Sequence, residues 1–127
     1  QTGEKKMADD LGVEWIVGGD GFTWESDDME ATERAAQDAW GRAKALIEGG
    51  DFDLIILDEA TYPVTFGWID VDDVVGTIRS RPDSVNIIVT GRDAHASIVE
   101  VADTVTEMRK VKHAFDEGII ARKGLDF

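Results

Sequence analysis

The sequence predicts an α/β fold organised around a mostly parallel sheet, and three stretches support this prediction. Residues 54–57 and 85–89 are short apolar runs rich in β-branched side chains, a composition typical of strands covered on both faces. Residues 28–48 instead repeat their apolar positions with helical spacing. Strands that alternate with helices form parallel sheets, so the 127 residues are expected to make a single α/β domain.

The first half of the chain contains one further strand and the longest helix. Val13–Val17 is expected to be a strand that the glycine-rich residues 18–21 close. The helix at 28–48 has Asp27 as its N-cap and Glu30 at the capping-box position. Its core-facing residues are expected to be Ala31, Ala35, Ala39, Trp40, Ala43, Leu46 and Ile47.

The second half contains two more helices and a last strand. Asp70 caps a short helix that Pro82 ends, and a third helix is expected over about 94–102. His95 is interpreted as a solvated helix residue, because no His or Cys lies at metal-ligand spacing from it. Thr104–Met108 is expected to be the last parallel strand. The inward residues of the two helices are expected to be Val71, Val74, Val75 and Ile78, and then Ala94, Ile98 and Ala102.

Composition excludes several classes of function. With 27 acidic and 13 basic residues the formal charge is −14, and such a surface repels phosphate backbones, so nucleic-acid binding is not expected. The chain has no cysteine for a disulfide or a thiolate metal site. It contains neither an apolar run of about 18 residues, as a membrane span needs, nor a signal-peptide core. A cytoplasmic protein without membrane contact is therefore expected.

An acid pair follows the first apolar run. Ligands of open α/β sheets bind beyond the carboxyl ends of the strands, which is where Asp58 and Glu59 are expected. An apolar strand that ends in Asp-Glu is the Walker B pattern, whose acid holds the Mg²⁺ of a nucleoside triphosphate directly or through water. The pattern alone leaves a second interpretation open, namely a core strand whose end happens to be acidic.

Positive charge concentrates near the C-terminus. Five of the 13 Lys and Arg residues lie between Arg109 and Lys123. Polyphosphate is a fitting partner for them, because Arg and Lys donate charge-assisted hydrogen bonds to phosphate oxygens. The alternative is a basic surface that balances neighbouring acids.

Four motifs follow one another along the chain and together resemble one family. They are Gly-Phe-Thr-Trp-Glu at 21–25, Leu-Asp-Glu-Ala-Thr-Tyr at 57–62, Ile-Val-Thr-Gly-Arg at 88–92, and Val-Lys-His-Ala-Phe-Asp at 111–116, continued by Gly-Leu-Asp-Phe at 124–127. In combination they resemble the P-loop type of ATP:cob(I)alamin (corrinoid) adenosyltransferase over nearly the whole chain. ABC-type ATPases share Leu-Asp-Glu-Ala-Thr but carry a Leu-Ser-Gly-Gly signature that is absent here.

The resemblance implies an activity and its participants. The family moves the 5′-deoxyadenosyl group of ATP to the cobalt of a reduced corrinoid in adenosylcobalamin biosynthesis and releases triphosphate. ATP, Mg²⁺ or Mn²⁺ and the corrinoid would therefore bind, an electron-donating flavoprotein reductase would act beforehand, and the chain would pair as a homodimer. The implied fold is the three-layer, mostly parallel sheet of P-loop NTPases of the RecA-like type.

The resemblance also implies roles for individual residues. Phe22 and Trp24 match the aromatic pair that packs on the lower face of the corrin and favours four-coordinate Co(II). Glu59 matches the Mg²⁺ ligand, with Asp58 as its second or water-mediated partner. Positions around the nucleotide are matched by Arg92, Lys112 and His113.

One departure from the family pattern is large, because the sequence contains no Gly-x-x-x-x-Gly-Lys-Ser/Thr loop to cradle phosphates. The polar start without Met suggests a C-terminal portion of a longer domain, with a sheet incomplete at its N-terminus. On that interpretation the 127 residues alone would show little or no ATP turnover. Two alternatives stay open: a paralogue that binds corrinoid without adenosylating it, and a different nucleotide-dependent ATPase.

Overall fold

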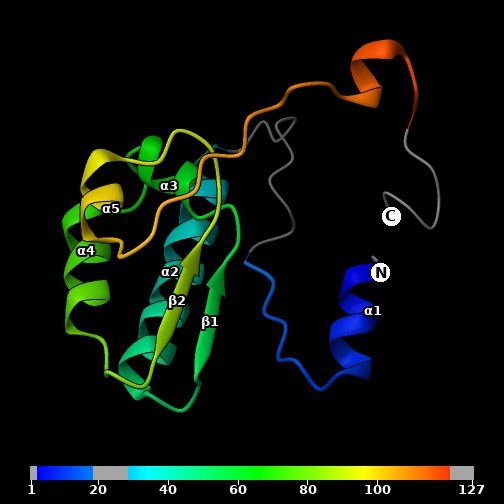
Figure 1. The fold of residues 1–127 in the computed structure, drawn as a ribbon. Coiled ribbons are helices and arrows are strands. Elements are labelled where there is room, and N and C mark those ends of the chain that lie inside the picture. The colour runs from blue at the N-terminus through cyan, green and yellow to red at the C-terminus, as the bar shows by residue number, and fades with distance from the viewer. Residues whose placement is uncertain (1–2, 19–28, 121–127) are drawn as a thin grey trace. The chain divides into compact units, whose positions relative to one another are not determined.

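The computed structural model describes residues 3–18 and 29–120, and the chain divides into two compact units. Residues 17–105 form one unit and residues 1–16 with 106–127 form the other. The first contains α2 (Met29–Gly49), β1 (Leu54–Leu57), α3 (Thr61–Thr65), α4 (Val71–Ser80), β2 (Asn86–Val89) and α5 (Ala96–Val101) (Figure 1). The second contains α1 (Gly3–Asp10) and the 3₁₀ helix η1 (Ala114–Glu117). The predicted α/β class is confirmed.

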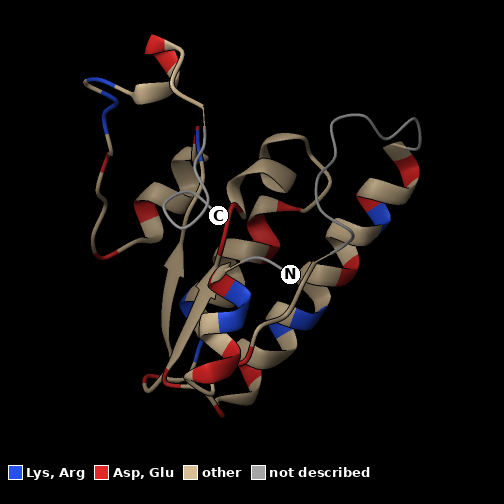
Figure 2. Ribbon diagram, turned by 90° about the vertical axis from the view of Figure 1, so that its right-hand side faces the viewer, with Lys and Arg blue, Asp and Glu red and all other residues tan. Residues whose placement is uncertain are grey.

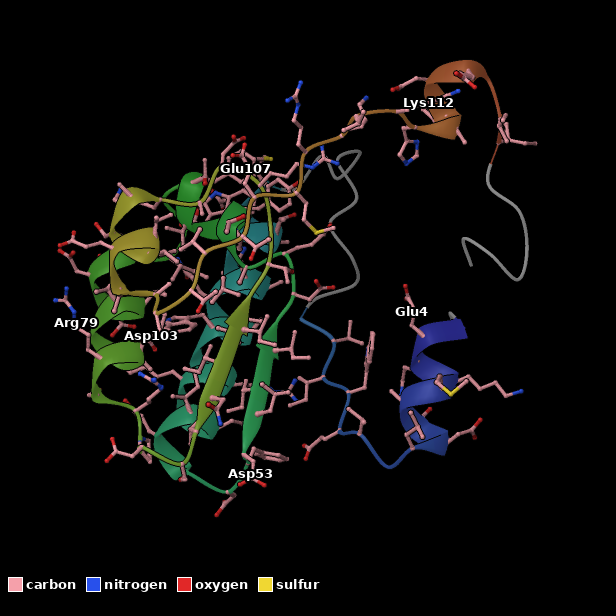
Figure 3. All side chains as sticks on the ribbon, in the orientation of Figure 1. Glu4, Asp53, Arg79, Asp103, Glu107 and Lys112 are labelled. Atoms are coloured by element: carbon pink, nitrogen blue, oxygen red, sulfur yellow. The ribbon has the colours of Figure 1, made fainter. Side chains whose placement is uncertain are left out.

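The two strands pair in parallel, as the sequence predicts. Leu54 lies opposite Asn86 and Leu57 opposite Val89, and the chain passes from one strand to the other through α3 and α4. The backbone N–H of Asn86 donates to the carbonyl of Asp53 at 2.9 Å, and its side-chain amide donates to the same oxygen at 3.0 Å. The two strands are therefore joined at their N-terminal ends, where Figure 3 labels Asp53.

Only one face of the sheet is covered, so the prediction of two covered faces is wrong for the described residues. Ile87 and Val89 pack against the buried cluster that the helices build. Leu54, Ile56 and Ile88 point to the opposite face, where 49%, 58% and 46% of their surfaces are exposed. The elements that contribute to the core all lie on the first face, and side chains alternate along a strand, so every second apolar residue stays uncovered.

The core forms between the sheet and the short helices. Helix α4 packs against both α2 and α5. It begins at its N-cap Asp70, whose carboxylate accepts from the N–H of Asp72 at 2.9 Å, and it ends two residues before Pro82. The predicted Asp70 cap of α4 is confirmed, and so are the inward positions Val74, Val75 and Ile78, whereas in α5 only Ile98 of the three predicted inward residues is buried. The buried cluster consists of Val64, Ile69, Val74, Val75, Ile78 and Ile98.

Helix α2 spans the predicted length, but its alanine face has a different role from the expected one. Ala36 and Ile47 are its buried residues, whereas Ala31 is exposed. The backbone of Gly18 packs closely against Ala39, since a Cβ added to Gly18 would lie only 2.7 Å from the Ala39 Cβ. Small side chains on α2 therefore admit a close approach of the chain segment that enters this unit. The predicted N-cap, Asp27, lies outside the described residues.

Two predicted strands do not form. Val13–Val17 and Thr104–Met108 carry the expected apolar side chains, yet neither pairs with a strand in the described part of the chain. Their apolar alternation specifies which side chains could be buried, but a strand also needs a partner backbone for its N–H and C=O groups. Among the described residues, moreover, no helix is long and apolar enough to cross a membrane.

Helix α5 is also shorter than predicted, with Ala94 and Ala102 both outside it and exposed. The helix begins after His95, whose Nδ1 accepts from the N–H of Ser97 at 3.2 Å. His95 is therefore the exposed N-cap of α5.

A three-residue contact joins α2 to α4 at the edge of the core. The carboxylate of Asp73 accepts from the indole N–H of Trp40 at 2.8 Å and from Lys44 Nζ at 2.6 Å. The hydrogen bond from Lys44, and to a smaller extent that from Trp40, lowers the pKa of Asp73. The hydrogen bond to Asp73 likewise raises the pKa of Lys44. The contact thus holds both charges in their ionised forms between the two helices.

We expect Asp73→Asn to destabilise the protein at neutral pH. A folded-state pKa below the ordinary value gives stability that is present above about pH 4 and is lost as the pH falls through the folded pKa. Urea unfolding at a series of pH values should therefore show the difference in unfolding free energy between wild type and variant shrinking below about pH 4.

Asp72→Asn is the matched control, because it removes an exposed carboxylate from the same turn of α4. It should change stability by no more than about 0.5 kcal/mol. If the difference in unfolding free energy between wild type and Asp73→Asn stayed constant between pH 7 and pH 3, the stabilising role of the Asp73 carboxylate would be contradicted.

Candidate functional site

The candidate site lies where the two strands end. Because Leu57 lies opposite Val89, the residues that follow each strand emerge side by side at the same edge of the sheet. The ladder continues one step further, with the N–H of Thr90 donating to the carbonyl of Leu57 at 3.1 Å. Two predicted site segments, Asp58 with Glu59 and the loop that contains Arg92, are thus brought together.

The hydroxyl of Thr90 connects this loop to the acid pair. It donates to Asp58 Oδ1 at 2.6 Å and accepts from the backbone N–H of Glu59 at 2.9 Å. One side chain from the end of β2 therefore holds a carboxylate and a main-chain donor that follow β1. The sequence motif contained Thr90, but its contact with the neighbouring strand was not predicted.

Glu59 adopts an unusual backbone conformation. Its φ is +53°, in the left-handed region that residues with a Cβ rarely occupy. Such a conformation costs of order 1 kcal/mol or more and persists when neighbouring contacts determine it. The hydrogen bond from its N–H to Thr90 is one such contact, and the chain turns directly from Glu59 into α3.

A second threonine makes the reciprocal connection. Thr61, which is 2% exposed, donates from its hydroxyl to the carbonyl of Arg92 at 2.8 Å. Gly91 lies so close to it that an added Cβ would overlap with the Thr61 side chain, and the φ of Gly91 is +148°. The loop after β2 is therefore seated on the start of α3, and only glycine fits at position 91.

The side chains at this edge are accessible. Asp58, Glu59 and Arg92 are all exposed, so two carboxylates and one guanidinium are available to a bound molecule. No group of three or more His, Cys, Asp or Glu in the described part of the chain could hold a metal by itself. A pair of carboxylates nevertheless fits Mg²⁺, which typically keeps several waters and binds through one or two carboxylates plus phosphate oxygens.

The remaining predicted cations belong to the other unit. Lys112 pairs with Glu117 at 3.0 Å, and Lys110 pairs with Asp116 at 2.7 Å. Figure 2 shows the basic segment ahead of the acidic helix η1, and Figure 3 labels Lys112 there. Both lysines therefore balance neighbouring acids, as the alternative interpretation of the basic cluster predicted. Their exposure makes each pair worth little energy, so an anionic ligand can compete for them.

His113 has a local structural role in that unit. Its Nδ1 accepts from the N–H of Phe115 at 3.1 Å and so caps η1. Because Nδ1 is the acceptor, a neutral His113 ring carries its proton on Nε2, which can donate to a ligand.

The chain matches one protein family along its whole length. The model of ATP:corrinoid adenosyltransferases BtuR/CobO/CobP matches residues 1–127. The chain belongs to this family. The corrinoid adenosyltransferase of Escherichia coli K12 is 39% identical over 126 residues. The enzyme named corrinoid adenosyltransferase CobA in Salmonella typhimurium is 38% identical over 126 residues, and that of Pseudomonas aeruginosa is 43% identical over 115.

The family match covers more of this chain than of its relatives. The alignments span 99% of this chain with the Escherichia coli and Salmonella typhimurium proteins and 91% with that of Pseudomonas aeruginosa. They span 64%, 64% and 57% of the relatives themselves. The chain thus spans less than two thirds of the length of these relatives.

The two aromatic site residues predicted from the family resemblance, Phe22 and Trp24, lie outside the described residues. A second aromatic pair is described close to the strand ends. The rings of Phe66 and Trp68, just after α3, have centroids 5.0 Å apart. Phe66 is 46% exposed, so this pair presents apolar surface beside the helix that Thr61 begins.

We expect Gly91→Ala to destabilise the protein by about 3 kcal/mol, because the new methyl group meets Thr61 and the backbone conformation disfavours any Cβ. The free energy of unfolding in urea measures the effect.

Gly76→Ala supplies the control. An added Cβ there meets nothing within 4 Å, and the residue lies inside α4, so alanine should stabilise by about 0.5–1 kcal/mol. Equal stability of Gly91→Ala and wild type would show that the close approach to Thr61 is wrong.

Proposed function

We propose that this chain takes part in transferring the 5′-deoxyadenosyl group of ATP to the cobalt of a reduced corrinoid, in the synthesis of adenosylcobalamin. The family match over residues 1–127 is the observation that carries the proposal. The joined strand ends support it, because they offer two carboxylates and a guanidinium at one edge of a parallel sheet. That is the edge at which α/β proteins bind nucleotides.

The reaction needs no nucleophile from the protein. The electron pair of Co(I) attacks C5′ of the ribose, the C5′–O bond breaks, and a cobalt–carbon bond forms as triphosphate leaves. The chain's task is to hold the reactants in line and to offset charge on the leaving group. Arg92, Lys112 and His113 are the donors we assign to the phosphates. We assign Phe22 and Trp24 to the corrin, where their apolar rings would exclude a lower axial ligand.

Glu59 is the residue we assign to a divalent cation, with Asp58 as its partner. When bound there, Mg²⁺ or Mn²⁺ would neutralise phosphate charge. The donor set supports this assignment, since both groups are carboxylates at an exposed strand end. Thr90 already occupies one oxygen of Asp58, which leaves Glu59 the freer ligand.

Further parts of the proposal follow from the same reaction. The chain would belong to a single α/β domain of the P-loop NTPase type, located in the cytoplasm, where ATP is available. A flavoprotein reductase would supply the electron that makes Co(I). Association as a homodimer is supported by the exposed apolar face of Leu54, Ile56 and Ile88.

Corrinoid binding tests the proposal directly. Titration of the 127-residue chain with cob(II)alamin should produce the visible spectrum of four-coordinate Co(II). Phe22→Ala and Trp24→Ala should abolish that spectrum and weaken binding by about tenfold or more, the loss typical of an aromatic hot-spot contact.

Trp15→Ala is the control for loss of an indole, since Trp15 lies in the other unit and is 41% exposed. Circular dichroism checks that each variant stays folded. A wild-type chain that leaves the cob(II)alamin spectrum unchanged would refute the corrinoid assignment.

Metal binding gives a separate test of the acid pair. Mn²⁺ should broaden the NMR signals of residues 58–61 and 90–92, and Glu59→Gln should raise its dissociation constant at least about tenfold, the factor that even outer partners of a ligand typically contribute. Glu100→Gln, which removes an exposed carboxylate from α5, should leave the titration unchanged. Equal loss in both variants would indicate nonspecific attraction to an acidic surface.

A further inference from the structure

The hydroxyl of Thr90 makes two hydrogen bonds, one as donor and one as acceptor. As donor it contacts Asp58 Oδ1 at 2.6 Å, and as acceptor it takes the N–H of Glu59 at 2.9 Å. A hydroxyl has one proton to donate and can accept at the same time, so the two bonds are compatible. Valine matches threonine in shape but would lose both.

The bond to Glu59 acts where the backbone needs support. A residue with φ of +53° is disfavoured by its own Cβ, so other contacts must select this conformation. Released from Thr90, Glu59 would relax toward the extended region and its side chain would leave its present direction. The bond to Asp58 meanwhile fixes the rotation of a carboxylate that is otherwise exposed.

We propose that Thr90 is a positioning residue that fixes the Asp58–Glu59 pair for a divalent cation, an inference that rests on the metal role assigned above. Thr90 itself does not touch the metal. It acts through Asp58 and Glu59 from a neighbouring strand, so the site is set by the pairing of β1 with β2. Thr61 donates a hydrogen bond to the carbonyl of Arg92 and so holds the loop that follows Thr90 in place.

Two measurements test this inference on the 127-residue chain. The first is hydrogen exchange at the Glu59 amide, which should be protected in the wild type and should exchange roughly fivefold faster in Thr90→Val, the loss expected for one hydrogen bond. The second is Mn²⁺ titration by NMR broadening, in which Thr90→Val should raise the dissociation constant about tenfold. Thr90→Ser keeps the hydroxyl and should restore both values.

Thr77→Val is the matched control. Thr77 is also a threonine with an engaged hydroxyl, which donates to the carbonyl of Asp73 at 2.8 Å inside α4, and it is 4% exposed. This variant should lose stability while keeping wild-type Mn²⁺ affinity and Glu59 protection. If Thr77→Val weakened Mn²⁺ binding as much as Thr90→Val, general loosening of the fold would be the cause and the inference would be overturned.

The outcomes separate this inference from the function on which it rests. If Thr90→Val binds Mn²⁺ as tightly as wild type while Glu59→Gln does not, the role of Thr90 is refuted and the metal site stands. If wild type shows no broadening at residues 58–61 and 90–92, the metal site and the inference fail together. An unprotected Glu59 amide in the wild-type chain overturns the inference without any variant.

Discussion

The parallel pairing of β1 with β2 is the constraint on which the described site depends. It aligns Leu57 with Val89, so residues separated by about thirty positions in sequence emerge at one edge. Two reciprocal hydrogen bonds then use this alignment, one from Thr90 to Asp58 and one from Thr61 to the carbonyl of Arg92. A shift of register by one residue would break both and would turn the apolar side chains to the wrong face.

The helices on one side of the sheet explain why this pairing is stable with so few strands. Their buried residues join Ile87 and Val89 in one apolar cluster, and Asp73 connects α2 with α4 beside it. A two-stranded sheet alone is marginal, and packing against helices supplies the burial that it lacks. On the opposite face Leu54 and Ile56 are exposed, and no described element covers these apolar side chains.

Charge in this protein is organised locally. The formal charge of −14 would oppose an anionic ligand, yet Lys110 and Lys112 are each held beside an acid of η1, and Arg92 is exposed near the strand ends. Exposed pairs of this kind exchange readily with solvent and with other anions, because screening leaves them little net energy. A phosphate ligand would therefore respond to where these cations lie and not to the average charge.

The sequence by itself determined the elements whose signals are local: the spacing of α2, the Asp70 cap and valine stripe of α4, the two apolar strands, and the acid pair that follows the first of them. It also placed the chain in its family through four ordered motifs. Only the tertiary structure decided that Val13–Val17 and Thr104–Met108 find no strand partner among the described residues, and that these residues leave one face of the sheet open. It also decided that Thr90 binds the Asp58 carboxylate and the Glu59 N–H. Periodicity records which side chains can be buried, whereas strand pairing and contacts across the sheet depend on backbones distant in sequence.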